Sequence, residues 1–371
     1  MFPIPLAISK LVAVLVASLL TMGCGSEKGS EEATTSSGAD QGIGLENRVV
    51  VYSPHGREIL SQFKELFEQA HPGTQVDFLY LSSQECLERV RGESQNPGAD
   101  VWWGAGHTTF MTAAQEGLLE PYEPTWASAV TPDQRDAENR WYACFLSPEI
   151  IFYNSQTVQP EDAPKDWADL ADPKWTDRIL MRFPLPSDTL RAIFFGMIDR
   201  SIKETGDENA AFDWMFEVDA NTKEYLSGGE QVFRKMAQRV GSVSVWTVSD
   251  IMLQKSRYNY PFEIVFPKSG SPVILDGVAL VKGAAHPKAA RAYYEFVTSA
   301  SSAALLANEP YYRIPTRSDI PKESLPQWMS SLDYTPQPLD WNLYAEKMND
   351  WMKRWDEEVK GQGKARREGQ G

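Results

Sequence analysis

Three stretches decide the fold: VVVYSPHG at residues 49–56, VDFLYLSSQE at 76–85 and ADVWWGAGH at 99–107. Each begins as a short apolar run, which is typical of a strand covered on both faces, and ends in small or polar residues. Apolar residues recur with helical spacing over 59–70, and the Ser82–Glu85 spacing is that of a capping box that starts a second helix. This β-α-β-α-β order predicts a parallel sheet with right-handed crossovers.

The alternation of strands and helices resumes further along the chain. We expect later strands at 150–153, 179–181, 242–248, 263–266 and 273–281. We expect helices at 190–198, at 230–239 after a second capping-box spacing in Ser227-Gly228-Gly229-Glu230, from 287 onward and at 341–359. The last of these carries a stripe of Trp, Tyr and Met, which is more often core packing than a surface for a membrane or partner. Residues 361–371 are expected to be a disordered polar tail.

The N-terminus has the features of a secretion signal. A continuous apolar run at 11–20 is too short to span a bilayer, which needs about 20 residues, and has the length of a signal core. It ends in Leu-Thr-Met-Gly-Cys, which resembles the lipobox of bacterial lipoproteins, although Thr21 stands where that box has Leu. We therefore expect a signal peptide at 1–23, lipidation of Cys24 and a flexible tether at 24–46 rich in Gly, Ser, Thr and Glu. Signal cleavage without lipidation is the alternative.

Composition limits the possible functions. The chain has 371 residues, of which 42% are hydrophobic, enough for a sizeable core in two domains or lobes. Lys and Arg number 36 against 51 Asp and Glu, so the net charge of -15 argues against nucleic-acid binding. With 3 Cys and 4 His there is little basis for a metal site, and no metal or cofactor is predicted. Cys86 and Cys144 are expected to be either a disulfide or, by preference, two buried thiols.

Catalytic sequence motifs are missing. The chain contains no Gly-x-Ser-x-Gly, no His-Glu-x-x-His, no Walker loop and no complete Gly-x-Gly-x-x-Gly. Four His make a His-based triad hard to build. We therefore do not expect an enzyme and predict no catalytic residue.

The candidate ligand site consists of helix starts that follow strands. Helix starts expose unpaired backbone N–H groups and the positive end of the helix dipole, and in parallel sheets ligands bind at the carboxyl ends of strands. Each Ser or Thr could equally be an ordinary helix cap. The candidate ligand-binding residues are Ser53, His55, Ser82, Ser83, Gln84, Gly104, Ser187, Asp188, Thr189, Trp246, Asp250, Asp276 and Tyr312.

The order of these elements resembles that of the extracellular solute-binding proteins of bacterial ABC importers, in the group that includes ferric-iron and organophosphonate binders. The stretches that carry the resemblance are 49–56, 71–73, 82–85, 99–102, 116–122, 167–173, 186–189, 276–280 and 286–290. The resemblance implies an α/β fold of two lobes, the type II periplasmic-binding-protein fold, in which each lobe is a mixed, mostly parallel sheet flanked by helices. The implied parts are lobe 1 at 47–148 and 277–318, lobe 2 at 149–276 and a C-terminal helical extension at 319–360.

The resemblance also implies the function. We expect a monomeric receptor in the cell envelope that closes on a small anionic or zwitterionic solute (a phosphonate, phosphate ester or carboxylate) and delivers it to a membrane permease. Ferric binders of this group use adjacent Tyr residues where this chain has Trp246-Thr247, so ferric iron is the alternative. Asp250 and Asp276 are candidates to meet an ammonium group. A secreted two-lobed enzyme and an adhesion or scaffold protein are further alternatives.

Overall fold

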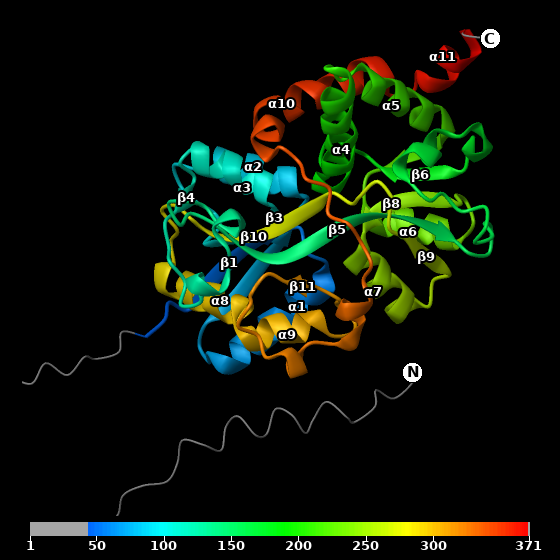
Figure 1. Ribbon diagram of the computed structural model, residues 1–371. Helices are drawn as coiled ribbons and strands as arrows, with labels where there is room; N and C mark the ends of the chain where they lie inside the picture. The colour runs from blue at the N-terminus through cyan, green and yellow to red at the C-terminus, as the bar shows by residue number, and fades with distance from the viewer. Residues whose placement is uncertain (1–43, 370–371) are drawn as a thin grey trace, which may run out of the picture. The chain divides into compact units, whose positions relative to one another are not determined.

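The computed structural model describes residues 44–369, and its longest strand, β5 (Tyr142–Asn154), belongs to two sheets. Its first half pairs with β10 (Val273–Val281) and its second half with β8 (Val243–Thr247), with the change of partner between Pro148 and Glu149. The main path of paired strands is β2-β1-β3-β10-β5-β8-β6-β7, and three further strands pair beside it. One chain of hydrogen-bonded strands thus carries two halves, which we call lobe 1 and lobe 2 (Figure 1).

Lobe 1 is built on the predicted β-α-β-α-β unit. Strand β1 (Arg48–Ser53) is parallel to both β2 (Gln75–Tyr80) and β3 (Val101–Gly106), and β10 returns antiparallel to β3. The remaining strands are β4 (Leu119–Glu120) and β11 (Ile314–Pro315). The helices are α1 (Arg57–Ala70), α2 (Ser83–Gly92), α3 (His107–Gln115), α8 (Pro287–Thr298) and α9 (Ala300–Ala307). The sheet is mixed, as expected, because the chain re-enters it through β10.

Lobe 2 repeats the arrangement with different elements. Strand β6 (Ile179–Arg182) is parallel to β7 (Thr222–Leu226) and to β8, while β9 (Phe262–Val265) runs antiparallel to β5. The helices are α4 (Asp188–Thr205), α5 (Asn209–Asn221), α6 (Gly229–Ala237) and α7 (Val248–Tyr258). Lobe 1 resumes with β10, whose pairing with the lobe 1 half of β5 begins at Val273, ahead of the expected boundary at residue 277.

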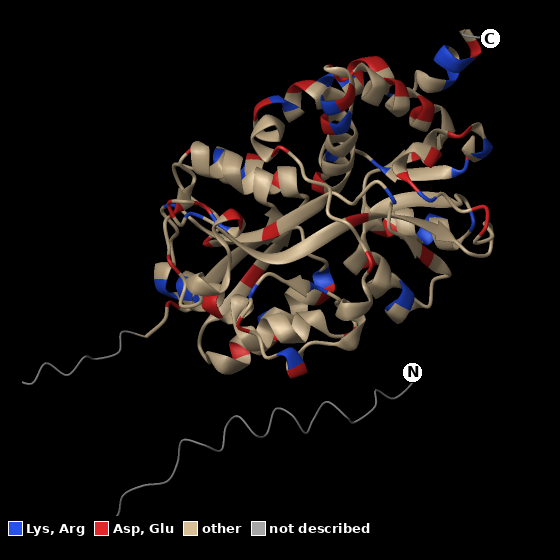
Figure 2. Cartoon of the chain, viewed as in Figure 1, with Lys and Arg blue, Asp and Glu red and all other residues tan. Residues whose placement is uncertain are grey.

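The C-terminal extension packs on the body. Helix α10 (Trp341–Arg354) ends sooner than predicted, and Trp355–Val359 continue it as a π-helical turn. Met348, Trp351, Met352 and Trp355 are buried in the core of lobe 2, which confirms that the aromatic stripe is a packing face. Figure 1 shows α10 beside α4, although the two helices are far apart in the sequence, and Figure 2 shows charges of both signs along α10 and α11.

The expectation of a disordered tail at 361–371 is wrong for the residues that the structure describes. Gly363–Gly369 form helix α11, which packs on α5. The Gly363 amide donates to the Asp219 carboxylate at 2.8 Å, and a Cβ at Gly363 would collide with the backbone of α5. Arg367 adds an ion pair to Glu217. A polar sequence thus forms a docked helix because its charges find partners on another element, which periodicity does not reveal.

Two further expectations concern cysteines and the N-terminus. Cys86 and Cys144 are buried free thiols, so the disulfide alternative is wrong. The signal peptide, Cys24 and all but the end of the tether lie outside residues 44–369. Among those residues, none of the helices combines the length and apolarity that a membrane span requires.

Candidate functional site

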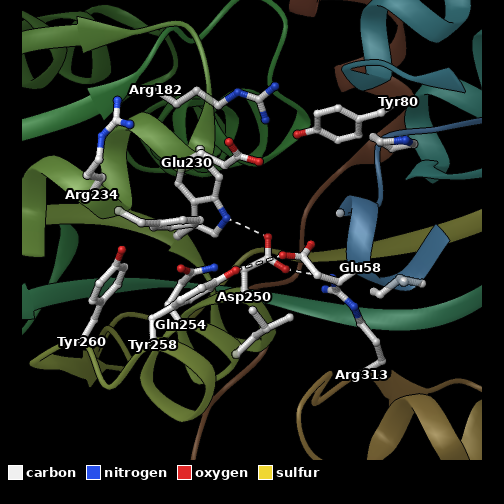
Figure 3. Close-up of a pocket in the computed structure, with 17 residues that line it drawn as sticks. Glu58, Tyr80, Arg182, Glu230, Arg234, Asp250, Gln254, Tyr258, Tyr260 and Arg313 are labelled. Atoms are coloured by element: carbon white, nitrogen blue, oxygen red, sulfur yellow. Dashed lines mark hydrogen bonds and ion pairs between the residues drawn. The ribbon is translucent and has the colours of Figure 1, made fainter. Parts of the chain in front are cut away.

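A cleft lies between the lobes, where the carboxyl ends of β1, β3, β6 and β8 meet the strands that cross between them. It contains two adjoining chambers. The floor chamber, of about 100 Å³, is lined by residues of the crossing strands β5 and β10 and by helix starts of both lobes. The outer chamber, of about 310 Å³, lies between α1 on one side and α6 and α7 on the other (Figure 3). Both chambers share Arg182, Trp246, Asp250 and Arg313.

Besides α3, three helices begin at this cleft without a side-chain cap. The residues before α1, α6 and α7 are Gly56, Gly228 and Thr247, and none makes a side-chain hydrogen bond to its own helix. The capping box predicted from Ser227 is wrong, because its hydroxyl donates to Gln231 instead. The first backbone N–H groups of these helices and their positive dipole ends are therefore available to an anion.

Arg182 is a cation without an ion-pair partner among residues 44–369. It is the last residue of β6, and burial lowers the pKa of its guanidinium, an effect that Tyr80 and the Asp188, Asp250 and Glu85 carboxylates offset only in part. Figure 3 shows its guanidinium directed towards the Tyr80 hydroxyl of lobe 1, with Arg234 of α6 on the same side of the chamber. The outer chamber thus combines two guanidinium groups with the uncapped start of α6.

Arg313, by contrast, is paired. Its guanidinium donates to Asp250 at 2.8 Å, and the Trp246 indole donates to the other oxygen of that carboxylate at 2.9 Å. Asp250 belongs to lobe 2 and Arg313 follows α9 of lobe 1, so this ion pair joins the two lobes across the cleft.

Carboxylates line the floor chamber. Asp276, on β10, accepts a hydrogen bond from the Ser147 hydroxyl, and burial raises its pKa to about 6. Glu149, on β5, is completely buried, and neither of its carboxylate oxygens has a hydrogen-bond partner in the described part of the chain. Burial raises the pKa of Glu149 well above its ordinary value, with nearby Asp276 and Asp250 acting in the same direction.

Asp188 connects the lobes at another helix start. It is the first residue of α4 in lobe 2, and its carboxylate accepts from the Gly106 backbone N–H at 2.8 Å and from the Gln84 amide at 3.0 Å. The Thr109 hydroxyl donates to the same carboxylate at 3.1 Å. All three donors belong to lobe 1, so the N-terminus of α3 already holds an anion, supplied by the protein itself.

The two histidines near the cleft are neutral. Burial lowers the pKa of His55 and of His107 to about 3. His55 lines the floor chamber with an unpartnered Nε2, whereas His107 accepts from the Leu275 amide through Nδ1. In the described ranges, no three His, Cys, Asp or Glu side chains gather into a metal site.

Eight of the thirteen residues selected from the sequence line the floor chamber. They are His55, Ser83, Ser187, Asp188, Thr189, Trp246, Asp250 and Asp276. Five of these already interact within the protein: Ser187 caps α4, Asp188 is held by lobe 1, Asp250 is bound by the Trp246 indole and Arg313, and Asp276 accepts from Ser147.

The other five residues have structural roles instead. Ser53 is buried and accepts from the His55 amide, Ser82 caps α2, and Gln84 holds Asp188. Gly104 has a φ of +93°, and the His55 ring fills the space that a side chain there would need. Tyr312 packs on Trp328. None of these five residues lines either chamber.

Several cleft residues were missed. Arg182 and Tyr80 stand at the ends of predicted strands, so the rule applied to Ser and Thr would also have found them. Glu149 interrupts an apolar run in β5, and a lone carboxylate in a buried strand is a recognisable signal. Arg313 and Arg234 carry no such signal, since only tertiary structure brings them to the cleft.

Two α/β lobes that share crossing strands around a polar cleft define a two-lobed binding protein that closes on its ligand. Residues 96–333 match the family of bacterial extracellular solute-binding proteins, and the chain belongs to that family. It is therefore a solute-binding receptor that acts on the periplasmic or extracellular side of the membrane. The predicted family and fold class are confirmed.

Relatives cover most of the chain. It is 25% identical over 320 residues to the probable ABC transporter periplasmic-binding protein y4fP of Sinorhizobium fredii, covering 85% of this chain and 87% of that protein. The structure of the periplasmic binding protein AfuA from Actinobacillus pleuropneumoniae with fructose-6-phosphate bound is similar with a TM-score of 0.74 and 22% identity, over 85% of this chain and 99% of that one. The structure of the ferric binding protein from Campylobacter jejuni is similar with a TM-score of 0.70 and 22% identity, over 83% of this chain and 98% of that one.

Proposed function

We propose that this protein is the receptor of an ABC importer for a small solute that carries a phosphate or phosphonate group. The single observation that carries the proposal is Arg182, a half-buried guanidinium that has no ion-pair partner within residues 44–369 and lies in the cleft beside the uncapped start of α6. A tetrahedral oxyanion supplies several acceptors, which suits a guanidinium and several backbone N–H groups at once. AfuA, which has a similar fold, was solved with fructose-6-phosphate bound, and this also favours a phosphate-bearing solute for the present protein.

Closure of the lobes follows from the same contacts. The Asp188 carboxylate and the Arg313–Asp250 pair already hold lobe 1 against lobe 2. A solute held by Arg182 of lobe 2 and by the start of α1 in lobe 1 would add to these contacts and favour the closed form. A ligand shifts such an equilibrium only through contacts that are better in one form than in the other. The closed form is then the one that docks on the permease.

Calorimetry on the purified protein tests the proposal. The panel consists of inorganic phosphate, alkylphosphonates, phosphate monoesters including a hexose phosphate, small carboxylates and ferric citrate. We expect 1:1 binding of at least one phosphate- or phosphonate-bearing solute, and loss of that binding in Arg182→Met. Binding of carboxylates alone, or of none of the anions, would contradict the proposal.

Ferric iron is the second candidate because three tyrosines, Tyr80, Tyr258 and Tyr260, line the outer chamber. Burial raises the pKa of Tyr80, so a phenolate there would need a strong cation nearby. The residues at the end of β8 are Trp246 and Thr247 rather than a tyrosine pair. A visible phenolate-to-iron absorption band that disappears in Tyr80→Phe would favour iron over the phosphate or phosphonate.

We further propose that the chain is tethered to the membrane as a monomer through a lipid on Cys24. The support is the apolar run at 11–20 followed by a cysteine and a polar tether. Mass spectrometry of the protein from native membranes should show a diacylated N-terminal cysteine, and Cys24→Ala should release the protein. We propose no catalytic role; turnover of a bound solute by the pure protein would reverse that view.

A further inference from the structure

The two chambers of the cleft differ in charge. The outer chamber contains three acidic side chains, Glu58, Glu230 and Asp250, and three arginines, Arg182, Arg234 and Arg313. The floor chamber contains four, Glu149, Asp188, Asp250 and Asp276, against only Arg182 and Arg313. The anion-binding groups are thus concentrated towards the outer chamber, and the floor chamber has an excess of negative charge.

Two of the four floor carboxylates are already satisfied. Asp250 is paired with Arg313, and Asp188 accepts from three donors of lobe 1. Asp276 has the Ser147 hydroxyl as its donor. Within residues 44–369 no donor meets Glu149 in hydrogen-bonding geometry, although the nearby Thr189 hydroxyl acts to lower its pKa. No cation there compensates Glu149, and Asp276 has only Arg313, which acts to lower its pKa without forming an ion pair with it.

A carboxylate such as Glu149 is an unusual feature in a protein interior. The residue is 0% exposed and lines the floor chamber, and within residues 44–369 neither carboxylate oxygen has a hydrogen-bond partner. Burying a polar group without a partner is costly, and for a charged group the cost is larger, so buried carboxylates are normally paired. The Thr247 hydroxyl and His55 Nε2, which line the same chamber, are also unpartnered. These groups point to a missing ligand group with several hydrogen-bond donors.

We propose that Glu149 and Asp276 bind a primary ammonium group carried by the same solute whose anionic end lies near Arg182. This inference rests on the function proposed above and narrows it to a zwitterionic solute. An ammonium has three donors and one positive charge, so it satisfies unpaired carboxylates in both respects. A hydroxyl would donate only one hydrogen bond and leave the excess charge in place. The neutral histidines, His55 and His107, cannot supply that charge.

The floor chamber is smaller than the outer one, about 100 Å³ against about 310 Å³, so it suits a compact amine-bearing end. Because Arg182 lines both chambers, a short chain can place the ammonium over the floor while the anion stays beside the guanidinium.

The test compares isosteric ligands on the full chain by calorimetry. The series is 2-aminoethylphosphonate, 2-hydroxyethylphosphonate and propylphosphonate, which differ only in whether the terminal group is ammonium, hydroxyl or methyl. We expect the amine to bind at least 10-fold more tightly than the other two. In Glu149→Gln and in Asp276→Asn this ratio should fall to within about 3-fold, while binding of propylphosphonate is kept, which shows that the variants are folded. Glu263→Gln, on the exposed side of β9, serves as the matched control.

A second measurement separates ammonium binding from hydroxyl binding. The carboxyls that face Glu149 are Asp276, Asp250 and Asp188, and Arg313 acts on Asp276. Because burial favours the protonated forms of Glu149 and Asp276, an ammonium should displace protons from them. Near pH 6 the binding heat of the amine should therefore depend on the ionisation enthalpy of the buffer, and this dependence should be smaller in Glu149→Gln, because the ionisation of the phosphonate itself contributes equally in both proteins.

The outcomes are distinct. Equal affinity for the amine and its methyl isostere, or the hydroxyl compound binding as tightly as the amine, overturns the ammonium site but leaves the anion receptor intact. Tight binding of Ca²⁺ alone that is lost in Glu149→Gln also overturns it, because the floor would then be a metal site. Absence of binding for every phosphonate and phosphate overturns the proposed function itself, and with it this inference.

Discussion

The starts of α3 and α6 are similar features with opposite uses. Both follow a glycine at the interlobe cleft and neither has a side-chain cap of its own. At α3 the Asp188 carboxylate of the other lobe occupies the Gly106 N–H at 2.8 Å. At α6 no residue of the described chain does so, and the nearby cations are Arg182 and Arg234.

The comparison shows that the N-terminus of a helix can serve two purposes. A helix start attracts an anion whether the anion belongs to the protein or to a solute. At α3 the carboxylate of Asp188 binds the helix start, and this contact holds the lobes together. At α6 the helix start and the guanidinium of Arg182 can bind a ligand instead.

Arg182→Met should have the largest effect. It removes the guanidinium while keeping most of the side-chain volume, so the solute's anion loses its desolvated partner. Truncation of one partner of such a pair costs about 2–5 kcal/mol, which corresponds to a loss of affinity of about 30-fold or more. Calorimetry measures the change, and Arg48→Ala, at an exposed ion pair far along β1, is the control. If the affinity of Arg182→Met for the solute stays within threefold of that of the unmodified protein, the start of α6 and Arg182 do not bind the anion.

Asp276→Asn should change how stability depends on pH. Because burial raises the pKa of Asp276 from 3.8 to about 6, the folded protein holds this proton more strongly than the unfolded chain does. The carboxyl therefore does not lower the free energy of unfolding near pH 3.5, and it lowers that free energy as the pH rises through about 6. A shift of this size corresponds to at most about 3 kcal/mol.

Urea unfolding at pH 4 and pH 7 measures this effect. The stability of Asp276→Asn relative to the unmodified protein should increase between the two pH values. Ser147→Ala, which removes the hydroxyl that donates to Asp276, should move the transition of the unmodified carboxyl to higher pH. If the stability difference between Asp276→Asn and the unmodified protein is the same at both pH values, the pKa of Asp276 is not raised in the folded protein.

Asp188→Ala should weaken the closed form of the empty protein. The substitution leaves the Gly106 N–H and the Thr109 hydroxyl without their acceptor, at a cost of about 1–3 kcal/mol. Small-angle X-ray scattering without ligand should give a larger radius of gyration, and a saturating solute should restore the smaller one. Asp188→Asn, which keeps one acceptor oxygen, should lie between the two. Identical scattering of all three proteins would show that Asp188 does not hold the lobes.

Tyr258→Phe should have the smallest effect. Its hydroxyl donates to Glu58 of the opposite lobe at 3.0 Å, but the side chain is 45% exposed. A hydrogen bond at the solvated rim of the cleft contributes about 0.5–1 kcal/mol, so the affinity should fall about fivefold at most. A loss as large as that of Arg182→Met would mean that the rim, and not the chamber, holds the anion.

The sequence predicted the fold better than the site. Short apolar runs at 49–52 and 101–103 form buried strands because both faces of a central strand must be covered, and this requirement is local and periodic. Gly363 shows the limit of such reasoning. Its segment is polar and aperiodic. The helix is held on α5 because the Gly363 amide donates to Asp219 and Arg367 pairs with Glu217.

The site shows the same limit at the scale of single residues. Ser82 and Ser227 have the same capping-box spacing, yet Ser82 caps its helix and Ser227 does not. The choice depends on the backbone geometry at the strand end, which the spacing alone does not encode. Arg313 reaches the cleft only through the fold of the chain that returns from α9, so no local pattern marks it.

By itself, the sequence determined the alternation of strands and helices, the excess of negative charge and the position of helix starts at strand ends, because these depend on neighbouring residues. Tertiary structure alone decided which helix start is filled by Asp188 and which stays open beside Arg182. It also decided that Glu149 has no hydrogen-bond partner in the part of the chain that the structure describes. The physical reason is that hydrogen bonding and ion pairing are settled by distances of about 3 Å between residues far apart in the chain, which only the packing of the two lobes can set.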